Sequence, residues 1–318
     1  MACGTFSGRE LMRSVAEHLD AILSKAQASR SLEVNLLGSV GCVLAQDVTV
    51  EDDDGSLEIL LGKGTIIAAR HIALISAAGL SRVWVHPQPR VVVLTVGDEL
   101  GEPGEEGKKP DINGLALTAA ATAAGAMTFR VGPLPSNPEL VASAIEDQLV
   151  RSDILIAACG MSAPDYQMLT GVLRDLGNLD FVRIAMQPGS AQGFGSIGPD
   201  ATPVFVVPGN PVGALLSFDI FIRPLIRRLM GNITLHHRTI EATLESDVSS
   251  NEDETTYIRA QLSTRKGELS VKSLEGAHTH PLEGLGTANA IIVVAPGTQN
   301  LAKGSRATVI RLDNDGDV

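Results

Sequence analysis

Cysteine and clusters of basic residues are both scarce in this sequence. Its 318 residues include three cysteines, Cys3, Cys42 and Cys159, which are scattered and form no Cys-x-x-Cys pair. An odd number of isolated cysteines argues against a disulfide framework and against a zinc site. The formal net charge is −12 and no block of Lys and Arg occurs, so the chain lacks a basic surface for nucleic acid or an anionic membrane. We therefore expect small molecules or proteins as partners, with no nucleic acid and no direct membrane insertion.

Long apolar runs are missing as well. No run reaches the roughly 18 residues that a membrane span requires, and the first residues, MACGTFSGRELMRS, contain no apolar signal core. The scattered cysteines also fit a reducing compartment. Together these features predict a cytoplasmic protein. The hydrophobic content of 44% is enough to bury a substantial core, and the length allows more than one domain.

The first ninety residues combine helical and extended patterns. Ser7 and Glu10 have the spacing of a capping box, which predicts an opening helix of roughly twenty residues. Residues 32–50 are typical of extended segments, and residues 66–80 have helical periodicity that ends at Gly79. A strand then ends at a proline-rich segment, which predicts a first domain over residues 1–89.

The remainder divides into two further patterns. Between residues 90 and 231, short continuous apolar runs alternate with helical segments, as expected for a parallel sheet that is covered on both faces. From residue 232 to residue 318, short strands alternate with turn residues, which predicts a small antiparallel barrel or sandwich. We therefore expect an α/β protein with a smaller domain on each side of its core domain.

Four loops of the predicted core domain follow strands and are candidates for a binding site. In parallel α/β sheets, ligands bind in a crevice at the carboxyl ends of the strands. Glycines allow close approach to a ligand, and the amides at the following helix starts favour anionic groups. Such loops are more often structural turns when they occur singly, so the interpretation depends on their combination. The loops lie at residues 97–100, 159–166, 187–190 and 208–211.

These loops carry the resemblance to a known family. The segments VVVLTVGDEL at 91–100, CGMSAPDY at 159–166, MQPG at 186–189 and VPGNPVGA at 207–214 resemble, in order, motifs of the MoeA and gephyrin E-domain family, the molybdopterin molybdenumtransferases. The resemblance implies a three-layer MogA-like parallel-sheet core, an elongated N-terminal dimerisation domain and a small C-terminal β-barrel. It also implies a homodimer whose cleft holds adenylylated molybdopterin, with magnesium and molybdate as further ligands.

The resemblance assigns roles to individual residues. Glu99 and Asp165 match acidic positions of the family and are the predicted catalytic and magnesium-binding residues. The ligand-binding positions that it implies lie in the same loops and at the start of the helix near residue 113: Gly97, Asp98, Asp111, Asn113, Gly160, Ser162, Pro188, Gly189, Pro208, Gly209, Asn210 and Pro211.

Departures from the family pattern lie in the same segments. The family's PPFDNSAMDGY segment and its inserted domain are reduced to residues 50–62. The family's motif SGGVSxGDYD is replaced by ACGMSAPDYQ at 158–167. Its motif MKPGKP is replaced by MQPGSA at 186–191, which lacks both lysines. Each lost charge-assisted contact to an oxyanion is worth roughly 1.5–3 kcal/mol. We therefore expect a shortened and degenerate member of the family.

Two functional hypotheses from different classes follow, and a third lies between them. The favoured one is a catalytically impaired, gephyrin-like dimeric scaffold that needs no cofactor and binds a peptide of a partner protein, such as a bacterial division or membrane protein. The alternative is an active molybdopterin molybdenumtransferase that inserts molybdate into adenylylated molybdopterin. The intermediate is a module that binds the molybdopterin nucleotide without turnover.

Several other polar residues have structural interpretations. His236-His237 and His278-Thr-His280 are more typical of exposed turns than of a metal site. Cys159 is expected to be a buried, inert thiol. Asp219 and Arg223 have the spacing of an ion pair on one helix, which Pro224 is expected to kink.

Overall fold

The computed structural model describes residues 12–24, 26–51, 56–160, 163–265, 267–274 and 282–312. The predicted capping box at Ser7 and the histidines at 278 and 280 lie outside these residues. The opening helix is shorter than predicted, because strand β1 (Met12–Arg13) precedes it and helix α1 (Val15–Leu23) has nine residues. Its capping box is formed by Ser14 and Glu17, whose backbone amide donates to the Ser14 hydroxyl at 3.2 Å.

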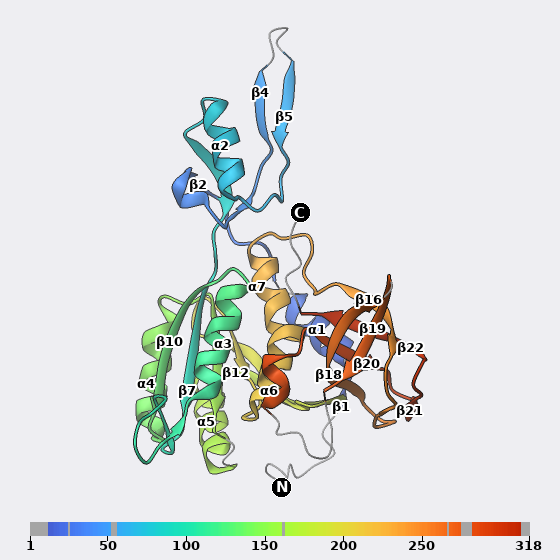
Figure 1. Ribbon diagram of the computed structural model, residues 1–318. Helices are drawn as coiled ribbons and strands as arrows, with labels where there is room; N and C mark the ends of the chain where they lie inside the picture. Colours follow the sequence, from blue (N-terminus) through green and yellow to red (C-terminus); the bar gives the residue numbers. More distant parts are fainter. Residues whose placement is uncertain are drawn as a thin grey trace.

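A small N-terminal unit extends away from the rest of the molecule (Figure 1). Its antiparallel sheet has the order β2-β6-β3, and the hairpin of β4 and β5 projects beyond it, at the position of the reduced inserted domain. Leu44, Ile67, Ile75 and Val85 form its buried centre. The elements are β2 (Leu32–Asn35), the 3-10 turn η1 (Leu37–Ser39), β3 (Val43–Leu44), β4 (Val48–Glu51), β5 (Leu57–Leu61), α2 (Ala69–Ala77) and β6 (Arg82–His86).

The central sheet has seven strands in the order β1-β12-β14-β15-β11-β7-β10. Strands β7, β10, β11 and β15 run parallel, as predicted, but β14 runs antiparallel to both β12 and β15. The sheet is therefore mixed, and β14 is a strand that the sequence pattern did not reveal. The strands are β7 (Arg90–Val96), β10 (Met127–Leu134), β11 (Ile154–Cys159), β12 (Gly177–Ile184), β14 (Ala191–Ile197) and β15 (Thr202–Val206).

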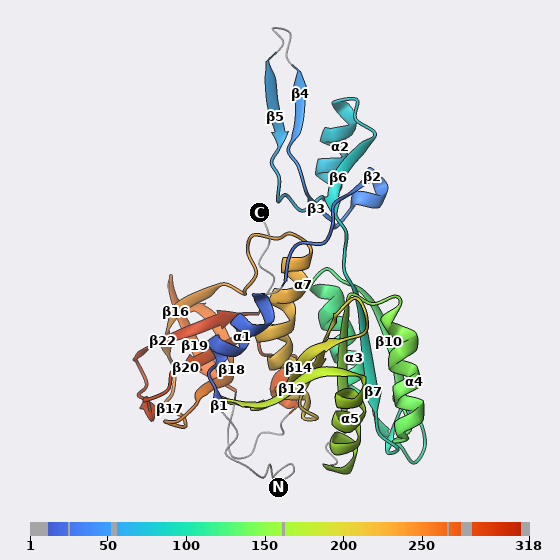
Figure 2. The same ribbon diagram turned by 180° about the vertical axis from the view of Figure 1, so that it is seen from behind.

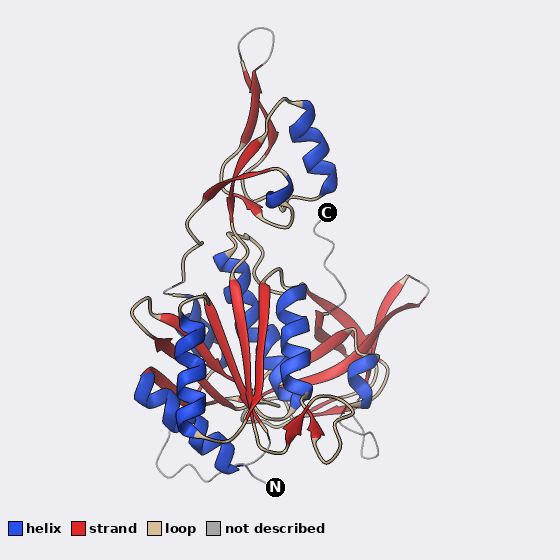
Figure 3. Ribbon diagram, turned by 90° about the vertical axis from the view of Figure 1, so that its left-hand side faces the viewer, coloured by secondary structure: helices blue, strands red, loops and turns tan. Residues whose placement is uncertain are grey.

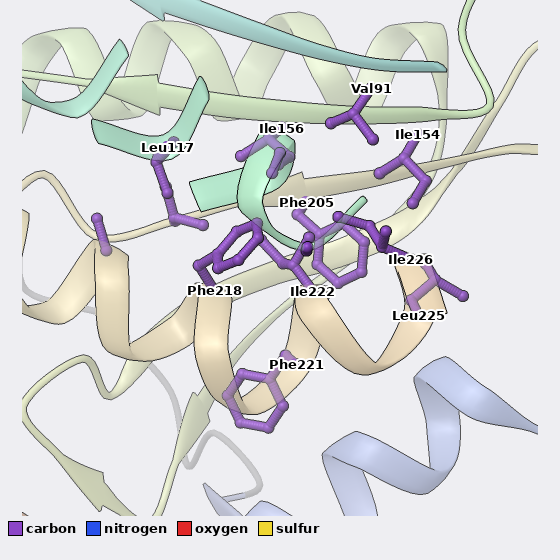
Figure 4. Close-up of a cluster of buried hydrophobic side chains, with 14 of the residues drawn as sticks. Val91, Leu117, Ile154, Ile156, Phe205, Phe218, Phe221, Ile222, Leu225 and Ile226 are labelled. Atoms are coloured by element: carbon purple, nitrogen blue, oxygen red, sulfur yellow. The ribbon is translucent and has the colours of Figure 1, made fainter. Parts of the chain in front are cut away.

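Helices cover both faces of this sheet, which confirms the predicted three-layer core (Figure 3). On one face, Phe218 and Ile222 pack against strand residues such as Ile156 (Figure 4), together with α3, α7 and α1. On the other face, α4 and α5 contribute Ile145 and Leu169 to a second buried cluster. The helices are α3 (Ile112–Ala123), α4 (Pro138–Leu149), α5 (Ala163–Leu176), α6 (Pro211–Ser217) and α7 (Arg223–Leu229).

A π-helical turn, η2 (Phe218–Ile222), joins α6 to α7. Pro224 is the second residue of α7 and has no amide hydrogen to donate to the preceding π turn. The predicted kink is therefore a local widening of a continuous helical segment rather than a break.

The C-terminal strands close into a five-stranded barrel, as predicted, but β16 and β19 run parallel, so the barrel is not antiparallel throughout. Pairing runs around the circle from β18 to β19, β16, β22, β20 and back to β18. Residues such as Leu244, Val271 and Ile292 fill its interior. The strands are β16 (Thr239–Leu244), β18 (Thr255–Arg265), β19 (Glu268–Ser273), β20 (Ala290–Val294) and β22 (Arg306–Arg311). Short strands β17 (Val248–Ser249) and β21 (Asn300–Leu301) and the 3-10 turn η3 (Glu283–Gly286) complete this part.

Two short strands pair with a sheet in another part of the molecule. Strand β1 pairs with β12 of the central sheet, and α1 lies beside α7 (Figure 2). Residues 12–24 therefore pack on the core, whereas the predicted first domain included them. Strand β13 (Met186–Gln187) pairs with β18 of the barrel, which connects the core to the barrel. Among the described helices, none is long and apolar enough to cross a membrane.

Candidate functional site

A cavity of about 470 Å³ lies at the carboxyl ends of β7 and β11. It is bordered by the first residues of α3 and α6 and by the short paired strands β8 (Leu100–Gly101) and β9 (Lys109–Pro110). Three of the four predicted loops therefore meet here. We call it the Glu99 cavity; it is lined by Glu99, Leu100, Lys109, Pro110, Asp111, Ile112, Asn113, Cys159, Gly160, Gly209 and Pro211.

Two glycines allow the loops to meet this closely. A Cβ atom on Gly160 would collide with the Oε1 atom of Glu99, and one on Gly209 would lie 2.7 Å from the carbonyl oxygen of Gly160. The Glu99 carboxylate therefore lies directly against the backbone of the neighbouring loop. In the described part of the chain it accepts no hydrogen bond, which leaves its oxygens available to a ligand.

Asp111 has a structural role in the same cavity. It is the N-cap of α3, where its Oδ1 accepts the Gly114 amide at 2.9 Å. Its Oδ2 accepts the Thr95 hydroxyl at 2.8 Å and pairs with Arg130 at 2.8 Å. Only 1% of its surface is exposed. These contacts use both carboxylate oxygens, so Asp111 positions the start of α3.

Asn113, by contrast, has unused hydrogen-bonding capacity. Its side chain is 8% exposed, and its Nδ2 donates to the carbonyl of Gly209 at 2.8 Å. That bond fixes the orientation of the amide and leaves Oδ1 buried without a partner. A buried acceptor without a donor costs roughly 1–3 kcal/mol. Because this oxygen is buried from solvent, it is not exposed to the open cavity.

The second predicted metal ligand, Asp165, is held by the loop before α4. Ser136 donates its backbone amide to Asp98 at 2.9 Å and its hydroxyl to Asp165. Asp165 is 8% exposed and is not among the residues that line the Glu99 cavity. Within the described ranges, no group of three or more metal-ligating side chains occurs. A shared magnesium site at Glu99 and Asp165 therefore stays a prediction.

The fourth loop, residues 187–190, lies apart from the other three. Gly189 has a φ of +94° and packs against α6, where an added Cβ would lie 3.3 Å from both the Gly213 carbonyl oxygen and Ser217 Oγ. Pro188 lines a second cavity of about 170 Å³ between the core and the barrel. The expected single crevice is therefore divided in two. The second cavity is lined by Ala120, Pro188, Val212, Leu215, Leu216, Asp219, Tyr257, Arg259, Leu285, Ala288, Ile291 and Leu312.

The other predicted ligand-binding positions have mixed surroundings. Asn210 is the N-cap of α6, and its Oδ1 accepts the Val212 amide at 3.0 Å. Gly97 is buried, and an added Cβ there would lie 3.0 Å from Glu99 Oε2. Pro208 packs near Gly213 at the base of α6. Ser162 lies outside the described residues.

The structure also shows the surroundings of the residues that were predicted to have structural roles. Cys159 is 2% exposed, which confirms that it is buried. Asp219 lies 3.1 Å from the Nε2 atom of His237, and Arg223 donates to the carbonyl of Leu235. In the second cavity, burial raises the pKa of Tyr257 to about 12.

The protein is therefore an α/β protein with a cavity at the carboxyl ends of parallel strands, the position where such folds bind ligands, and the comparisons identify its family. The family profile described as "Probable molybdopterin binding domain" matches residues 92–228, and the profile of the MoeA C-terminal region (domain IV) matches residues 241–312. The chain belongs to the MoeA family.

Individual relatives agree with this assignment. Molybdopterin molybdenumtransferase 1 of Mycobacterium tuberculosis is 37% identical over 274 residues, which are 83% of this chain and 64% of that protein. The molybdopterin molybdenumtransferase of Bacillus subtilis is 28% identical over 256 residues, or 79% of this chain and 59% of that protein. The chain therefore spans less than two thirds of the length of these relatives.

A solved structure supports the fold. The molybdopterin biosynthesis MoeA protein from Pyrococcus horikoshii superposes with a TM-score of 0.81 and 18% identity, covering 95% of this chain and 100% of that chain. At that identity the likeness concerns the fold alone.

Proposed function

We propose that the Glu99 cavity binds a phosphorylated molybdopterin ligand and that the protein acts in molybdenum cofactor biosynthesis as a molybdopterin molybdenumtransferase. The names of the relatives in Mycobacterium tuberculosis and Bacillus subtilis support this activity. The observation that carries the proposal is the Glu99 carboxylate, which lines the cavity beside the starts of two helices and accepts no hydrogen bond from other described residues. Such a carboxylate can hold the magnesium ion that accompanies a phosphorylated ligand.

The surroundings of Asn113 suit an anionic ligand. The first residues of both α3 and α6 line the cavity, and the amino ends of helices favour phosphate through their dipoles and amides. Gly160 and Gly209 add backbone that a ligand can approach without meeting a side chain. In this proposal Asn113 holds the cavity wall in place through Gly209, and the helix ends hold the phosphate groups.

The cavity also fits magnesium, which the family implies. Magnesium is commonly held by one or two protein carboxylates, with phosphate oxygens and water at its other positions. Glu99 lines the cavity and its carboxylate is not engaged by other described residues, so it suits the single-carboxylate arrangement. When bound, the ion would neutralise charge on the phosphate groups, while molybdate would enter as the substrate.

The lost lysines of the 187–190 loop do not remove contacts from this cavity. Pro188 lines the second cavity, and neither Gln187 nor Ser190 lines the Glu99 cavity. The proposed site for the pterin nucleotide is therefore built without that loop. The intermediate hypothesis, in which the chain binds the nucleotide without turnover, differs from the enzyme only in what happens after binding.

Homodimerisation is part of the proposal and has support in the N-terminal unit. Large apolar side chains are strongly exposed there: Leu37 is 81% exposed, Leu57 71% and Ile59 59%. Exposed apolar side chains of this size are typical of protein interfaces. The scaffold hypothesis, with a bound peptide of a partner protein, stays a prediction, because no described contact identifies a peptide site. A cytoplasmic location likewise stays part of the proposal.

Titration calorimetry with adenylylated molybdopterin tests the binding step. We expect the unsubstituted protein to bind, and Asn113→Ala to weaken binding about tenfold, because it removes the bond to Gly209 that joins two walls of the cavity. Asn300→Ala is the matched control, since Asn300 is exposed on the barrel. Absence of binding by the unsubstituted protein, with its fold intact by circular dichroism, would exclude the proposal. Release of adenylate in the presence of molybdate and magnesium would separate the enzyme from the intermediate hypothesis.

A further inference from the structure

The charged side chains that line the Glu99 cavity differ in whether they already have a partner. Three charged side chains line it: Glu99, Lys109 and Asp111. Asp111 is already paired with Arg130 at 2.8 Å. Of the described residues that line the cavity, Lys109 alone carries a positive charge. We propose that Lys109 is the residue that binds the ligand's phosphate in this cavity, an inference that rests on the proposed function.

The backbone places Lys109 firmly at the cavity wall. Its amide donates to the carbonyl of Glu99 at 2.7 Å, and β9 pairs with β8 so that Lys109 lies opposite Leu100. Two residues later, the amide of Asp111 donates to the carbonyl of Gly101 at 2.9 Å. Because the backbone is held on both sides, the position of Lys109 Cα is fixed while its side chain keeps its reach.

The two adjacent lysines have different environments. Lys108 donates its Nζ to the carbonyl of Asp98 at 2.6 Å, so its ammonium group stabilises the loop after β7. Lys109 is exposed, and its ammonium group makes no hydrogen bond or ion pair within the described structure. An unengaged lysine acts as a mobile point charge and binds phosphate without a fixed geometry.

The chemistry of the cavity divides between its two charged side chains. Glu99 attracts a metal ion or N–H donors, whereas Lys109 attracts phosphate oxygens, so the two bind different parts of one ligand. Lys109 thus supplies a cation in a family member that has lost both lysines of the 187–190 loop. Because Lys109 is exposed, water and salt screen its contact, and the expected effect is moderate.

The test is calorimetric titration of adenylylated molybdopterin at low salt and at about 0.15 M salt. The variants are Lys109→Gln, Lys109→Arg and Lys272→Gln. The last makes the same charge change at an exposed position of the barrel. We expect Lys109→Gln to weaken binding about 3- to 10-fold at low salt and to reduce the salt dependence. Lys109→Arg should retain most of the affinity, and Lys272→Gln should match the unsubstituted protein.

The outcomes separate this inference from the proposed function. If the unsubstituted protein binds and Lys109→Gln binds equally well, the role of Lys109 is overturned while the function of the cavity stands. Equal losses in Lys109→Gln and Lys272→Gln would show a general effect of net charge and would also overturn it. No binding by the unsubstituted protein would overturn both.

Discussion

Asn113 donates its Nδ2 to the carbonyl oxygen of Gly209 at 2.8 Å, which ties the first turn of α3 to the loop before α6. The two residues are 96 positions apart in the sequence. The bond uses the amide nitrogen and leaves the amide oxygen buried without a partner. Two walls of the Glu99 cavity are therefore held together by a contact between distant loops.

Alanine at Gly160 and at Gly209 should have different effects. A Cβ at Gly209 meets backbone oxygens of Gly160 and Cys159, so we expect Gly209→Ala to destabilise the fold by roughly 1–3 kcal/mol. A Cβ at Gly160 meets the flexible end of Glu99, so Gly160→Ala should move that carboxylate at little cost in stability and weaken ligand binding. Chemical denaturation and titration calorimetry measure the two effects.

The control for both variants is Gly171→Ala. An added Cβ at Gly171 in α5 meets no atom within 4 Å, and alanine favours a helix by about 0.5–1 kcal/mol. Equal stability losses at Gly160 and Gly209 would contradict the contact between Gly160 and Glu99.

Arg130 contacts two carboxylates whose burial differs greatly. Asp111 is 1% exposed in its side chain and Glu102 is 58% exposed. Removal of one partner from a buried pair costs roughly 3–5 kcal/mol, whereas an exposed pair contributes about 0–1 kcal/mol. We therefore expect Arg130→Gln to destabilise the fold by a few kcal/mol in urea denaturation and Glu102→Gln to have little effect. A similar loss for both variants would contradict a structural role for Asp111.

The parts of the fold that could be predicted are those with strong local signals. Strands such as 91–96 are continuous apolar runs because both of their faces are buried. Strand β14 was missed because Gly193 and Gly195 interrupt its pattern. In the structure these glycines lie against Phe181 and the backbone of Asn178 and Leu179, so the strand depends on pairing with a distant partner. A local window of sequence does not contain that information.

The candidate site was predictable to a similar extent. The loops were located because glycines and carboxylates follow buried strands, and the family resemblance supplied their roles. The division into two cavities was not foreseen, because it depends on Met186 pairing with Thr255 of the barrel and on Gly189 packing against α6. The bond of Asn113 was equally unforeseen, since it depends on the distant carbonyl of Gly209.

The exposed apolar side chains of the N-terminal unit predict an effect on assembly. If this surface joins two copies, Leu37→Asp and Leu57→Asp should each shift the protein toward monomer in light scattering at a given concentration. Neither change should alter monomer stability by more than about 0.5 kcal/mol, since surface substitutions rarely do. Val150→Asp is the control, because Val150 is 87% exposed at the end of α4 in the core. Unchanged assembly in both N-terminal variants would exclude this surface as the dimer interface.

His18 predicts how stability depends on pH. It is 1% exposed in α1, and its ring lies 4.8 Å from that of Phe221. Burial is the main cause that lowers its pKa from 6.5 to about 4. As the pH falls below 6.5, the unfolded chain binds a proton that the folded chain does not, so stability should fall by about 2–3 kcal/mol down to pH 4. Urea denaturation from pH 7 to pH 4.5 should show a shallower decline for His18→Leu. An identical decline would assign the acid sensitivity to other groups.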